Sequence, residues 1–303
     1  ANRKYVERFI LNNSTTILGG AAAGDWAGLR YKFLGVTGSD SLVWLRDHYQ
    51  QRPAEQIVPI IDAVFTRILK PWYGQPRWET VKLYEEHDPR SLFPSLREAA
   101  EQVLGVSANS PLMPCPELGI DLPNPYHFLE HEFPRRKEQS RLWYTSICHG
   151  DLNMQNILLD DRENIYVIDF SETRPRNIVS DLARLEPIVK FEMVKIDDAA
   201  GLRQMLEFEK GLISATTLHQ IPPFTYPGSD PSVRKAYEVI RLLRRHANTV
   251  TIFETDIVPY WLALLEWTLP VVVYVQMSDW QKKYAAYSAA LLCEAITTLE
   301  SSL

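Results

Sequence analysis

Apolar residues recur at helical spacing through most of the chain beyond residue 41. Positions i, i+3 and i+4 are apolar in residues 41–49, 53–69 and 95–104, and in four long stretches between residues 180 and 303. Ser95 followed by Glu98 has the spacing of a capping box, which predicts that a helix starts there. A further helix is expected at residues 2–10. The pattern predicts a large, mostly helical body.

Strand signals are confined to two parts of the chain. Apolar and β-branched residues at 15–18 and 29–34, separated by a glycine-rich turn, predict a short hairpin. Residues 157–160 and 165–168 predict two more short strands joined by a polar turn. Because strands and helices are segregated along the chain, we expect an α+β fold rather than a doubly wound sheet.

The glycine cluster at residues 19–24 has the composition of a phosphate-binding loop. A Walker-type loop ends in Gly-Lys-Ser/Thr, so that a cation and a hydroxyl meet the phosphates and Mg²⁺. This cluster ends in Gly24-Asp25, and an aspartate at that point would repel phosphate. We therefore interpret the cluster as the turn of the hairpin.

Prolines interrupt residues 106–141. This segment contains Pro111, Pro114, Pro116, Pro123, Pro125 and Pro134. Proline removes a backbone donor and breaks regular elements, and long irregular segments in compact domains tend to be functional. We expect an irregular insertion or recognition loop at residues 106–141.

Composition narrows the class of protein. The chain has 303 residues, of which 46% are hydrophobic and 23% charged, as is ordinary for a folded globular protein. A net charge of −6 argues against nucleic acid or an anionic membrane as partner. The charged start of the sequence predicts no signal peptide. The apolar run at residues 257–275 contains Glu266 and two prolines, so we expect a buried helix there rather than a membrane span.

Three cysteines, Cys115, Cys148 and Cys293, are far apart in the chain. Their number and spacing fit neither a disulfide framework nor a zinc site. We expect reduced thiols and a cytoplasmic location.

The residues that carry chemistry lie in residues 146–170. His149-Gly150-Asp151 is followed by Asn156, five residues after the aspartate, and Asp169 comes thirteen residues later. Mg²⁺ prefers oxygen ligands, and a carboxylate and an amide oxygen on a rigid hairpin can hold it against the phosphates of ATP. Asn156 and Asp169 fit that role. Asp151 would orient an acceptor hydroxyl and take its proton late in the reaction.

The pattern His-Gly-Asp-x-x-x-x-Asn with Ile-Asp-Phe resembles the aminoglycoside phosphotransferase and choline kinase family, whose fold is protein-kinase-like. The downstream Ser180-Asp181-Leu182-Ala183 is similar to the Asp-Leu-Ala of that family. The resemblance implies that Asp181 braces the catalytic loop, and we expect His149 to be a structural anchor. Residues 168–186 also resemble the ternary-complex-associated domains, which are kinase-like domains attached to bacterial conflict and signalling proteins.

The resemblance implies a small N-lobe and a large helical C-lobe. Residues 1–38 would form a partial N-lobe and hinge, and residues 39–303 the C-lobe. The backbone of the hinge would meet adenine at Lys32, Phe33, Leu34 and Gly35. A complete N-lobe carries a strand lysine that binds the phosphates, and no strand with such a lysine precedes the hinge here. We expect either that the lobe is truncated or that another segment or a partner chain completes it.

Three functions remain open. The first is transfer of the γ-phosphate of Mg·ATP to a hydroxyl of a small molecule or a protein. Its acceptor pocket would be built by residues 106–141 and the C-terminal helices, where Glu254, Asp256 and Glu266 would suit a cationic acceptor. The second is a catalytically weak or inactive module that senses nucleotide or binds a partner within a larger assembly. The third, a hydrolase using Asp151 and Asp169, leaves the histidine, glycine and asparagine of the motif unexplained.

Overall fold

The computed structural model describes residues 17–24, 26–31 and 42–301, with the backbone alone for residues 17 and 26–31. The helix expected at residues 2–10 lies outside the described residues. So do the predicted adenine-binding residues Lys32, Phe33, Leu34 and Gly35, and the predicted domain boundary after residue 38.

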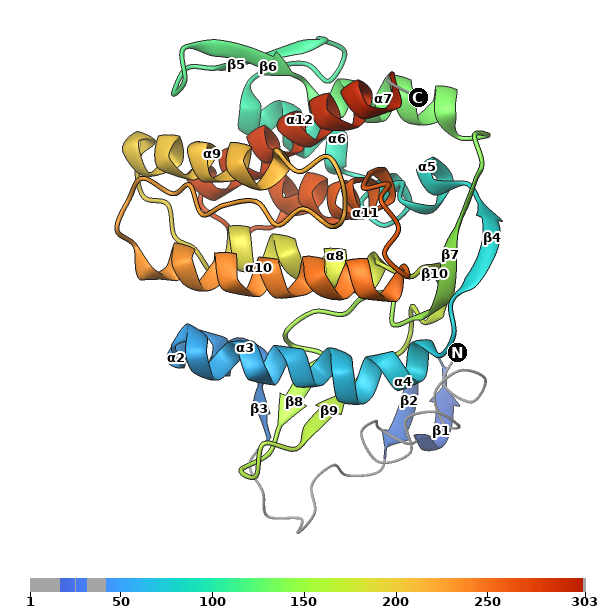
Figure 1. The fold of residues 1–303 in the computed structure, drawn as a ribbon. Coiled ribbons are helices and arrows are strands. Elements are labelled where there is room, and N and C mark those ends of the chain that lie inside the picture. The colour runs from blue at the N-terminus through green and yellow to red at the C-terminus, as the bar shows by residue number, and fades with distance from the viewer. Residues whose placement is uncertain (1–16, 25, 32–41, 302–303) are drawn as a thin grey trace.

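Helices form the larger part of the molecule and lie in stacked layers (Figure 1). The α-helices are α2 (Leu45–Gln51), α3 (Ala54–Ala63), α4 (Lys70–Tyr73), α5 (Leu83–Glu86), α6 (Leu96–Leu104), α7 (Pro125–Arg136), α8 (Ser180–Pro187), α9 (Ala199–Ile213), α10 (Pro231–Val250), α11 (Val258–Thr268) and α12 (Asp279–Glu300). Two π-helical turns, Val64–Leu69 and Ile188–Glu192, continue α3 and α8, and 3₁₀ turns occupy Pro89–Ser91 and Leu269–Val273.

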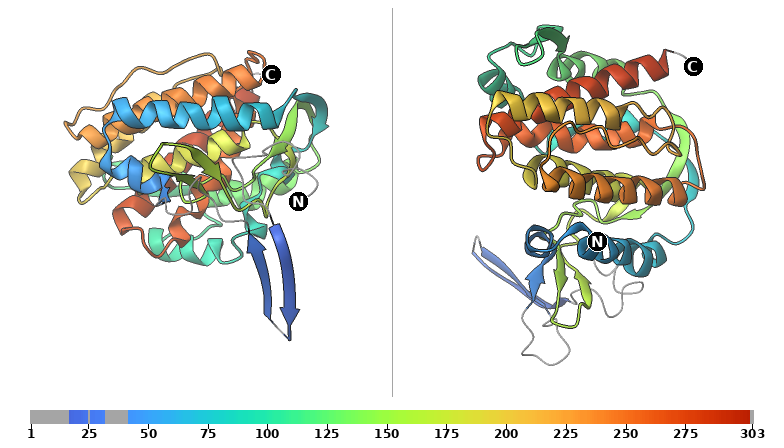
Figure 2. Two further views of the ribbon diagram at one scale, coloured as in Figure 1. Left: turned by 90° about the horizontal axis from the view of Figure 1, so that it is seen from below. Right: turned by 60° about the vertical axis from the view of Figure 1, so that its left-hand side comes forward.

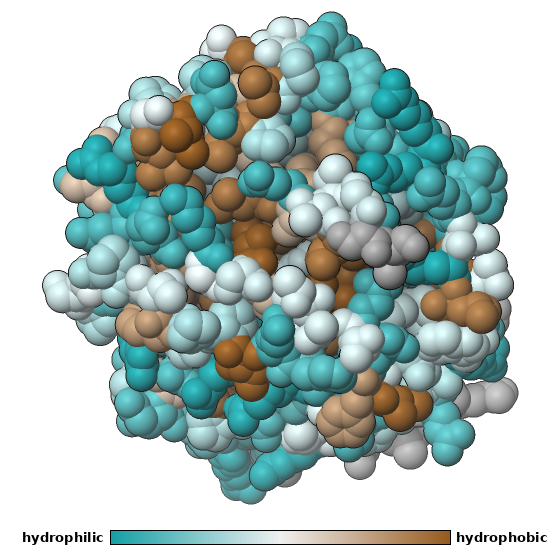
Figure 3. Space-filling model, turned by 45° about the horizontal axis from the view of Figure 1, so that its top comes forward, coloured by the Kyte–Doolittle hydropathy of each residue, from teal (hydrophilic) through white to brown (hydrophobic). Residues whose placement is uncertain are grey.

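The core is centred on α11, which packs against α8 and α12. Every residue of α11 is buried, which is why its sequence is apolar all round and lacks the one-sided pattern of a surface helix. The buried helix predicted at residues 257–275 is thus confirmed for Val258–Thr268; a 3₁₀ turn follows at Leu269–Val273, and Val275 is exposed. In the part of the chain that the structure describes, no helix is long and apolar enough to cross a membrane. The face in Figure 3 is mostly hydrophilic, with its apolar residues in separate patches.

The capping box predicted at the start of α6 is not formed, and one is present at the start of α12. The helix expected at residues 95–104 is α6, but the Ser95 side chain makes no capping hydrogen bond. A capping box forms instead at the start of α12, where the Ser278 and Gln281 side chains satisfy each other's backbone N–H. The helix periodicity was the reliable signal at α6, because it reports the face that packs on the core.

All described strand pairs are antiparallel. They form four small sheets: β1 (Ile17–Ala23) with β2 (Trp26–Tyr31); β3 (Val43–Trp44), β8 (Ile157–Leu159) and β9 (Ile165–Val167); β4 (Arg77–Val81), β7 (Arg141–Cys148) and β10 (Arg174–Asn177); and β5 (Leu112–Cys115) with β6 (Ile120–Pro123). The described residues therefore mix helices with small antiparallel sheets and contain no doubly wound sheet. The kinase-like type of the fold stays a prediction.

The predicted N-terminal hairpin is present as β1 and β2, which project from the helical body (Figure 2). Its glycines are placed differently from the prediction. Gly19 and Gly20 pair within strand β1, and the reversal comes at Gly24, whose φ is +59°. A left-handed φ at this turn is the conformation that glycine adopts most easily.

The expectation of an irregular segment is wrong for most of residues 106–141. Strands β5 and β6 form a hairpin there, and helix α7 follows. The prolines are tolerated because of where they stand. Pro125 occupies the first turn of α7, behind an Asn124 side chain that accepts the backbone N–H of Tyr126, and Pro114 and Pro123 lie in a two-stranded hairpin with open edges.

Candidate active site

The loop that carries the catalytic-type motif joins strand β7 to strand β8. His149 is completely buried, and its Nε2 lies 2.8 Å from the carbonyl oxygen of Ile168. Because a carbonyl only accepts, Nε2 carries the proton, and Nδ1 is free to accept the backbone N–H of Asp151 at 3.4 Å. The ring also packs against Trp72 and Phe170. His149 therefore ties the loop to the strand end that precedes Asp169.

Gly150 is required by two independent features of the loop. Its φ is +88°, a value that residues with a Cβ rarely adopt. A Cβ at this position would lie 2.9 Å from the carbonyl carbon of Glu172 and closer still to its oxygen. The close approach of residues 150 and 172 thus explains the glycine of the motif.

Asp181, at the start of α8, holds the same loop from the other side. Its carboxylate accepts the backbone N–H of His149 at 2.8 Å and that of Gly150 at 2.9 Å. It also accepts the hydroxyl of Tyr73 at 3.0 Å. Burial, with the Asp181 charge added, raises the pKa of Tyr73 well above its ordinary value, so this hydroxyl keeps its proton and donates. These contacts are of the bracing kind that the family resemblance implies for Asp181.

Asn156 directly precedes β8 and Asp169 follows β9, so both lie at the open end of the β8–β9 hairpin. The Asn156 amide nitrogen donates to the carbonyl oxygen of Asp151 at 2.9 Å, which leaves Oδ1 as its acceptor. The Asn156 carbonyl accepts the backbone N–H of Ile168 at 2.9 Å, so the residue before Asp169 is hydrogen-bonded to Asn156 itself. Asp169 has a left-handed φ of +59°, which aspartate tolerates better than most residues.

The donor set of these two residues fits a magnesium ion. Among the described residues, neither the Asn156 Oδ1 nor the exposed Asp169 carboxylate has a hydrogen-bonding partner. Mg²⁺ binds through one or two protein oxygens and otherwise keeps water and phosphate ligands. In the described part of the chain, no three or more histidine, cysteine or acidic side chains are grouped so that they could hold a metal ion.

Asp151 is partly exposed, and both of its carboxylate oxygens have partners. Oδ1 accepts from the Arg184 Nε at 3.0 Å, and Oδ2 accepts from the Asn153 amide at 3.2 Å. Arg184 lies over the ring of Trp267, with its guanidinium carbon 4.1 Å from the ring centroid. Asp151 thus stands in an ion pair whose cation is itself fixed by an aromatic side chain.

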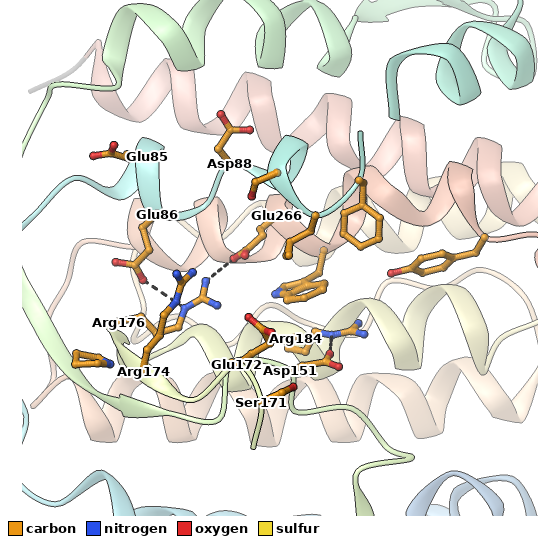
Figure 4. A pocket seen from close by; sticks show the side chains of 17 residues that line it. Glu85, Glu86, Asp88, Asp151, Ser171, Glu172, Arg174, Arg176, Arg184 and Glu266 are labelled. Carbon is orange, nitrogen blue, oxygen red and sulfur yellow. Dashed lines mark hydrogen bonds and ion pairs between the residues drawn. The ribbon is translucent and has the colours of Figure 1, made fainter. Parts of the chain in front are cut away.

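A cavity of about 690 Å³ opens beside Asp151 (Figure 4). It is lined by residues 85–93, the loop at Gly150 and Asp151, residues 171–176, and side chains from the C-terminal half of the chain: Glu85, Glu86, Asp88, Ser91, Leu92, Phe93, Gly150, Asp151, Ser171, Glu172, Arg174, Pro175, Arg176, Arg184, Glu266, Trp267 and Tyr274. In its floor Arg176 lies between Glu86 and Glu266 and pairs with both.

This lining corrects the predicted acceptor pocket. No residue of 106–141 lines the cavity beside Asp151; residues 85–93 take that place. Glu266 is buried and neutralised, since it accepts from Arg176 at 2.7 Å and meets His87 at 2.8 Å. Glu254 and Asp256 line a separate cavity. The three acidic residues therefore do not form one cationic pocket.

The sequence analysis did not identify Arg184, Tyr73 or Trp267. Arg184 follows Asp181 by three residues on α8, a spacing that puts both side chains on one face of the helix. Because Asp181 was expected to brace the catalytic loop, a position of Arg184 near that loop was open to prediction. Tyr73 and Trp267 come from helices far away in the chain and contact Asp181 and Arg184 on α8. Their roles depend on the packing of α4 against β7 and of α11 against α8.

Comparison with known proteins adds one family and two distant structures. The model of the family described as ternary complex associated domain 9 matches residues 114–262, just under half of the chain. This range includes the loop from His149 to Asp169 and Asp181. No protein with a curated description matches.

Two solved structures are distantly similar. A glucosamine kinase (crystal form B) is 12% identical with a TM-score of 0.46, over 99% of this chain and 69% of that one. A glucosamine kinase in complex with glucosamine, ADP and inorganic phosphate is 11% identical with a TM-score of 0.41, over 91% of this chain and 64% of that one. At these TM-scores neither likeness defines the fold. Over residues 114–262 the chain is similar to the ternary complex associated domain 9 family.

Proposed function

We propose that this protein transfers the γ-phosphate of Mg·ATP to a hydroxyl of an acceptor bound in the cavity beside Asp151. One observation carries the proposal: a continuous set of hydrogen bonds joins the three residues that this chemistry needs. The Asn156 amide bonds the Asp151 carbonyl, and the Asn156 carbonyl bonds the backbone next to Asp169. The arrangement leaves the amide oxygen and the Asp169 carboxylate for a metal and puts the Asp151 carboxylate at a cavity.

Each residue has a defined part in this reaction. Asn156 Oδ1 and the Asp169 carboxylate would hold Mg²⁺, which neutralises the charge of the phosphates when it is bound. Asp151 would orient the acceptor hydroxyl. The acceptor oxygen forms a bond to the γ-phosphorus, the bond from that phosphorus to the β–γ bridging oxygen breaks, ADP leaves, and the acceptor proton passes to Asp151.

His149, Gly150 and Asp181 would act by positioning. Preorganisation of the loop matters because a small displacement of a reacting group costs a large factor in rate. Three hydrogen bonds to a buried carboxylate and one from a buried imidazole are a rigid support for Asp151.

A second candidate function is a module that binds nucleotide or a partner without turnover. Two observations favour it: both Asp151 carboxylate oxygens are engaged within the protein, and the matching family is described as associated with a ternary complex. The fold alone does not separate the two candidates, since one fold can host unrelated functions.

Nucleotide binding is tested by thermal unfolding with ATP, in the presence and absence of Mg²⁺. We expect a Mg-dependent rise in the melting temperature that the Asp169→Asn variant loses. Asp197→Asn is the matched control, because Asp197 is an exposed aspartate outside the loop. If the unsubstituted protein shows no Mg-dependent shift, this polypeptide does not hold Mg·ATP and the proposal fails for it.

Turnover separates the two candidates. ADP release would be measured with a panel of small alcohols and of serine-, threonine- and tyrosine-containing peptides. A phosphotransferase gives ADP release with at least one acceptor, and Asp151→Asn abolishes it while keeping the thermal shift. A Mg·ATP shift with no ADP release for any acceptor favours the binding module.

A further inference from the structure

Arg184 lines two cavities, and Asp151 lines the larger of them. The larger is the cavity of about 690 Å³ described above, and the second has about 420 Å³. Tyr274 is the other residue common to both linings. Arg184 therefore borders both cavities while its side chain is paired with Asp151.

Only one nitrogen of this guanidinium is used inside the described protein. Nε donates to Asp151 at 3.0 Å, whereas the two terminal nitrogens donate to no side chain or carbonyl among the described residues. The group is nevertheless well fixed, because it stacks on Trp267 and its side chain is only 11% exposed. A fixed, partly buried guanidinium with two free N–H₂ groups is the usual protein partner of a phosphate or a carboxylate.

The other cations of the cavity are less suited to an anion. Arg176 is 4% exposed and already pairs with Glu266 and Glu86. Arg46, which lines the second cavity, is paired with Glu192 at 2.8 Å. Arg174 is exposed and has no aromatic platform among the described residues. Arg184 is thus the best-placed cation for an anion that arrives at Asp151.

We propose that Arg184 binds the transferred phosphoryl group through its terminal nitrogens, so that the Asp151–Arg184 pair is a subsite for a phosphate monoester. This inference rests on the proposed phosphotransfer. When the acceptor proton moves to Asp151, the carboxylate loses its charge and no longer neutralises Arg184. The Arg184 charge then faces the dianionic phosphate just joined to the acceptor oxygen.

The shared Asp151 carboxylate is what brings the two groups within reach of each other. An acceptor hydroxyl bonded to Asp151 lies about 3 Å from that carboxylate, and the Arg184 Nε is at the same range from it. The phosphorus is one covalent bond beyond the acceptor oxygen, and the terminal nitrogens are two bonds beyond Nε. Phosphate oxygens and guanidinium N–H₂ groups then meet over the shared carboxylate.

The subsite is tested by calorimetric titration with inorganic phosphate, with and without Mg·ADP. We compare the unsubstituted protein with Arg184→Gln, which removes the charge, and Arg184→Lys, which keeps the charge without the fork. Loss of charge-assisted hydrogen bonds of this kind weakens binding about tenfold or more. We expect that loss in Arg184→Gln and a smaller one in Arg184→Lys.

Arg203→Gln, at an exposed arginine on α9, controls for the change in net charge and is expected to bind phosphate as the unsubstituted protein does. Thermal unfolding of every variant shows that it is folded. The inference is overturned if the unsubstituted protein binds no phosphate, if Arg184→Gln binds it equally well, or if Arg203→Gln loses as much. The Mg·ATP thermal shift, measured on the same samples, reports separately on the proposed function: a shift that persists while phosphate binding is independent of Arg184 refutes the subsite alone.

Discussion

Replacement of Asp181 by asparagine tests the support of the candidate catalytic loop. The carboxylate accepts three hydrogen bonds in a fully buried place: Oδ2 from the His149 N–H and the Tyr73 hydroxyl, and Oδ1 from the Gly150 N–H. Asparagine has the same shape but only one acceptor oxygen. Whichever way its amide is placed, an N–H₂ group faces at least one backbone donor.

The magnitude follows from the better of the two amide orientations. With its oxygen at the Oδ2 position, the amide satisfies His149 and Tyr73 and leaves the Gly150 N–H buried without an acceptor. An unsatisfied buried donor costs about 1–3 kcal/mol, and the two remaining bonds lose about 1 kcal/mol each because they are no longer charge-assisted. Relief from burying a carboxylate offsets part of this loss. We expect the free energy of unfolding to fall by about 2–4 kcal/mol.

The assay is equilibrium unfolding in urea, followed by circular dichroism, for the unsubstituted protein, Asp181→Asn, Tyr73→Phe and the double variant. Tyr73→Phe removes one of the three bonds to Asp181, so its effect should be smaller in the Asp181→Asn background, where that bond is weaker. Asp197→Asn should change stability by no more than about 0.5 kcal/mol. A loss below about 0.5 kcal/mol for Asp181→Asn, or full additivity with Tyr73→Phe, would refute the reasoning.

Three more substitutions test other parts of the structure. Gly150→Ala should lower the free energy of unfolding by about 2–4 kcal/mol, and Gly105→Ala by about 1 kcal/mol. Both glycines have a left-handed φ, but only at Gly150 would a Cβ overlap another backbone segment, at Glu172. Equal losses in urea unfolding would contradict this overlap. Lys190→Met should lower the free energy of unfolding by about 3–5 kcal/mol, because Lys190 is buried between two carboxylates. Lys210→Met breaks an exposed ion pair and should lower it by at most about 1 kcal/mol. A small loss for Lys190→Met would show that the buried carboxylates find other partners. Burial alone would raise the pKa of Glu266, but the Arg176 guanidinium and the His87 ring together outweigh burial, and the pKa is lowered. The stability from these contacts is therefore present above the ordinary pKa of 4.5 and is lost as pH falls through the lower, folded-state value. Urea midpoints measured from pH 7 to pH 3 should fall more steeply for the unsubstituted protein than for Glu266→Gln, and parallel profiles would contradict the sign of this shift.

Much of the secondary structure was open to prediction because it depends on short-range patterns. Helix periodicity identified α6 and the buried α11, and apolar runs around a polar turn identified β8 and β9. The failure at residues 106–141 has a specific cause. Proline breaks a helix or strand only where its N–H or its φ is needed, and the first turn of α7 and the open edges of the β5–β6 hairpin need neither.

The candidate loop was predictable as a set of residue types, since one aspartate, one asparagine and a second aspartate at fixed spacing are the residue types that phosphotransfer chemistry uses. Their roles in a reaction stay predictions. The cavity was not predictable, because residues 85–93 carry no pattern that places them beside Asp151.

The sequence by itself determined which atoms are available: a glycine at 150, carboxylates at 151, 169 and 181, and an amide at 156. Tertiary structure decided what each of them meets. Gly150 is needed because a backbone 22 residues later, at Glu172, lies against it, and Asp151 is paired because α8 brings Arg184 to its side chain. Chemical identity is a property of one position, whereas contact between distant positions is set by the packing of helices that bury their apolar faces together, and no local pattern encodes that arrangement.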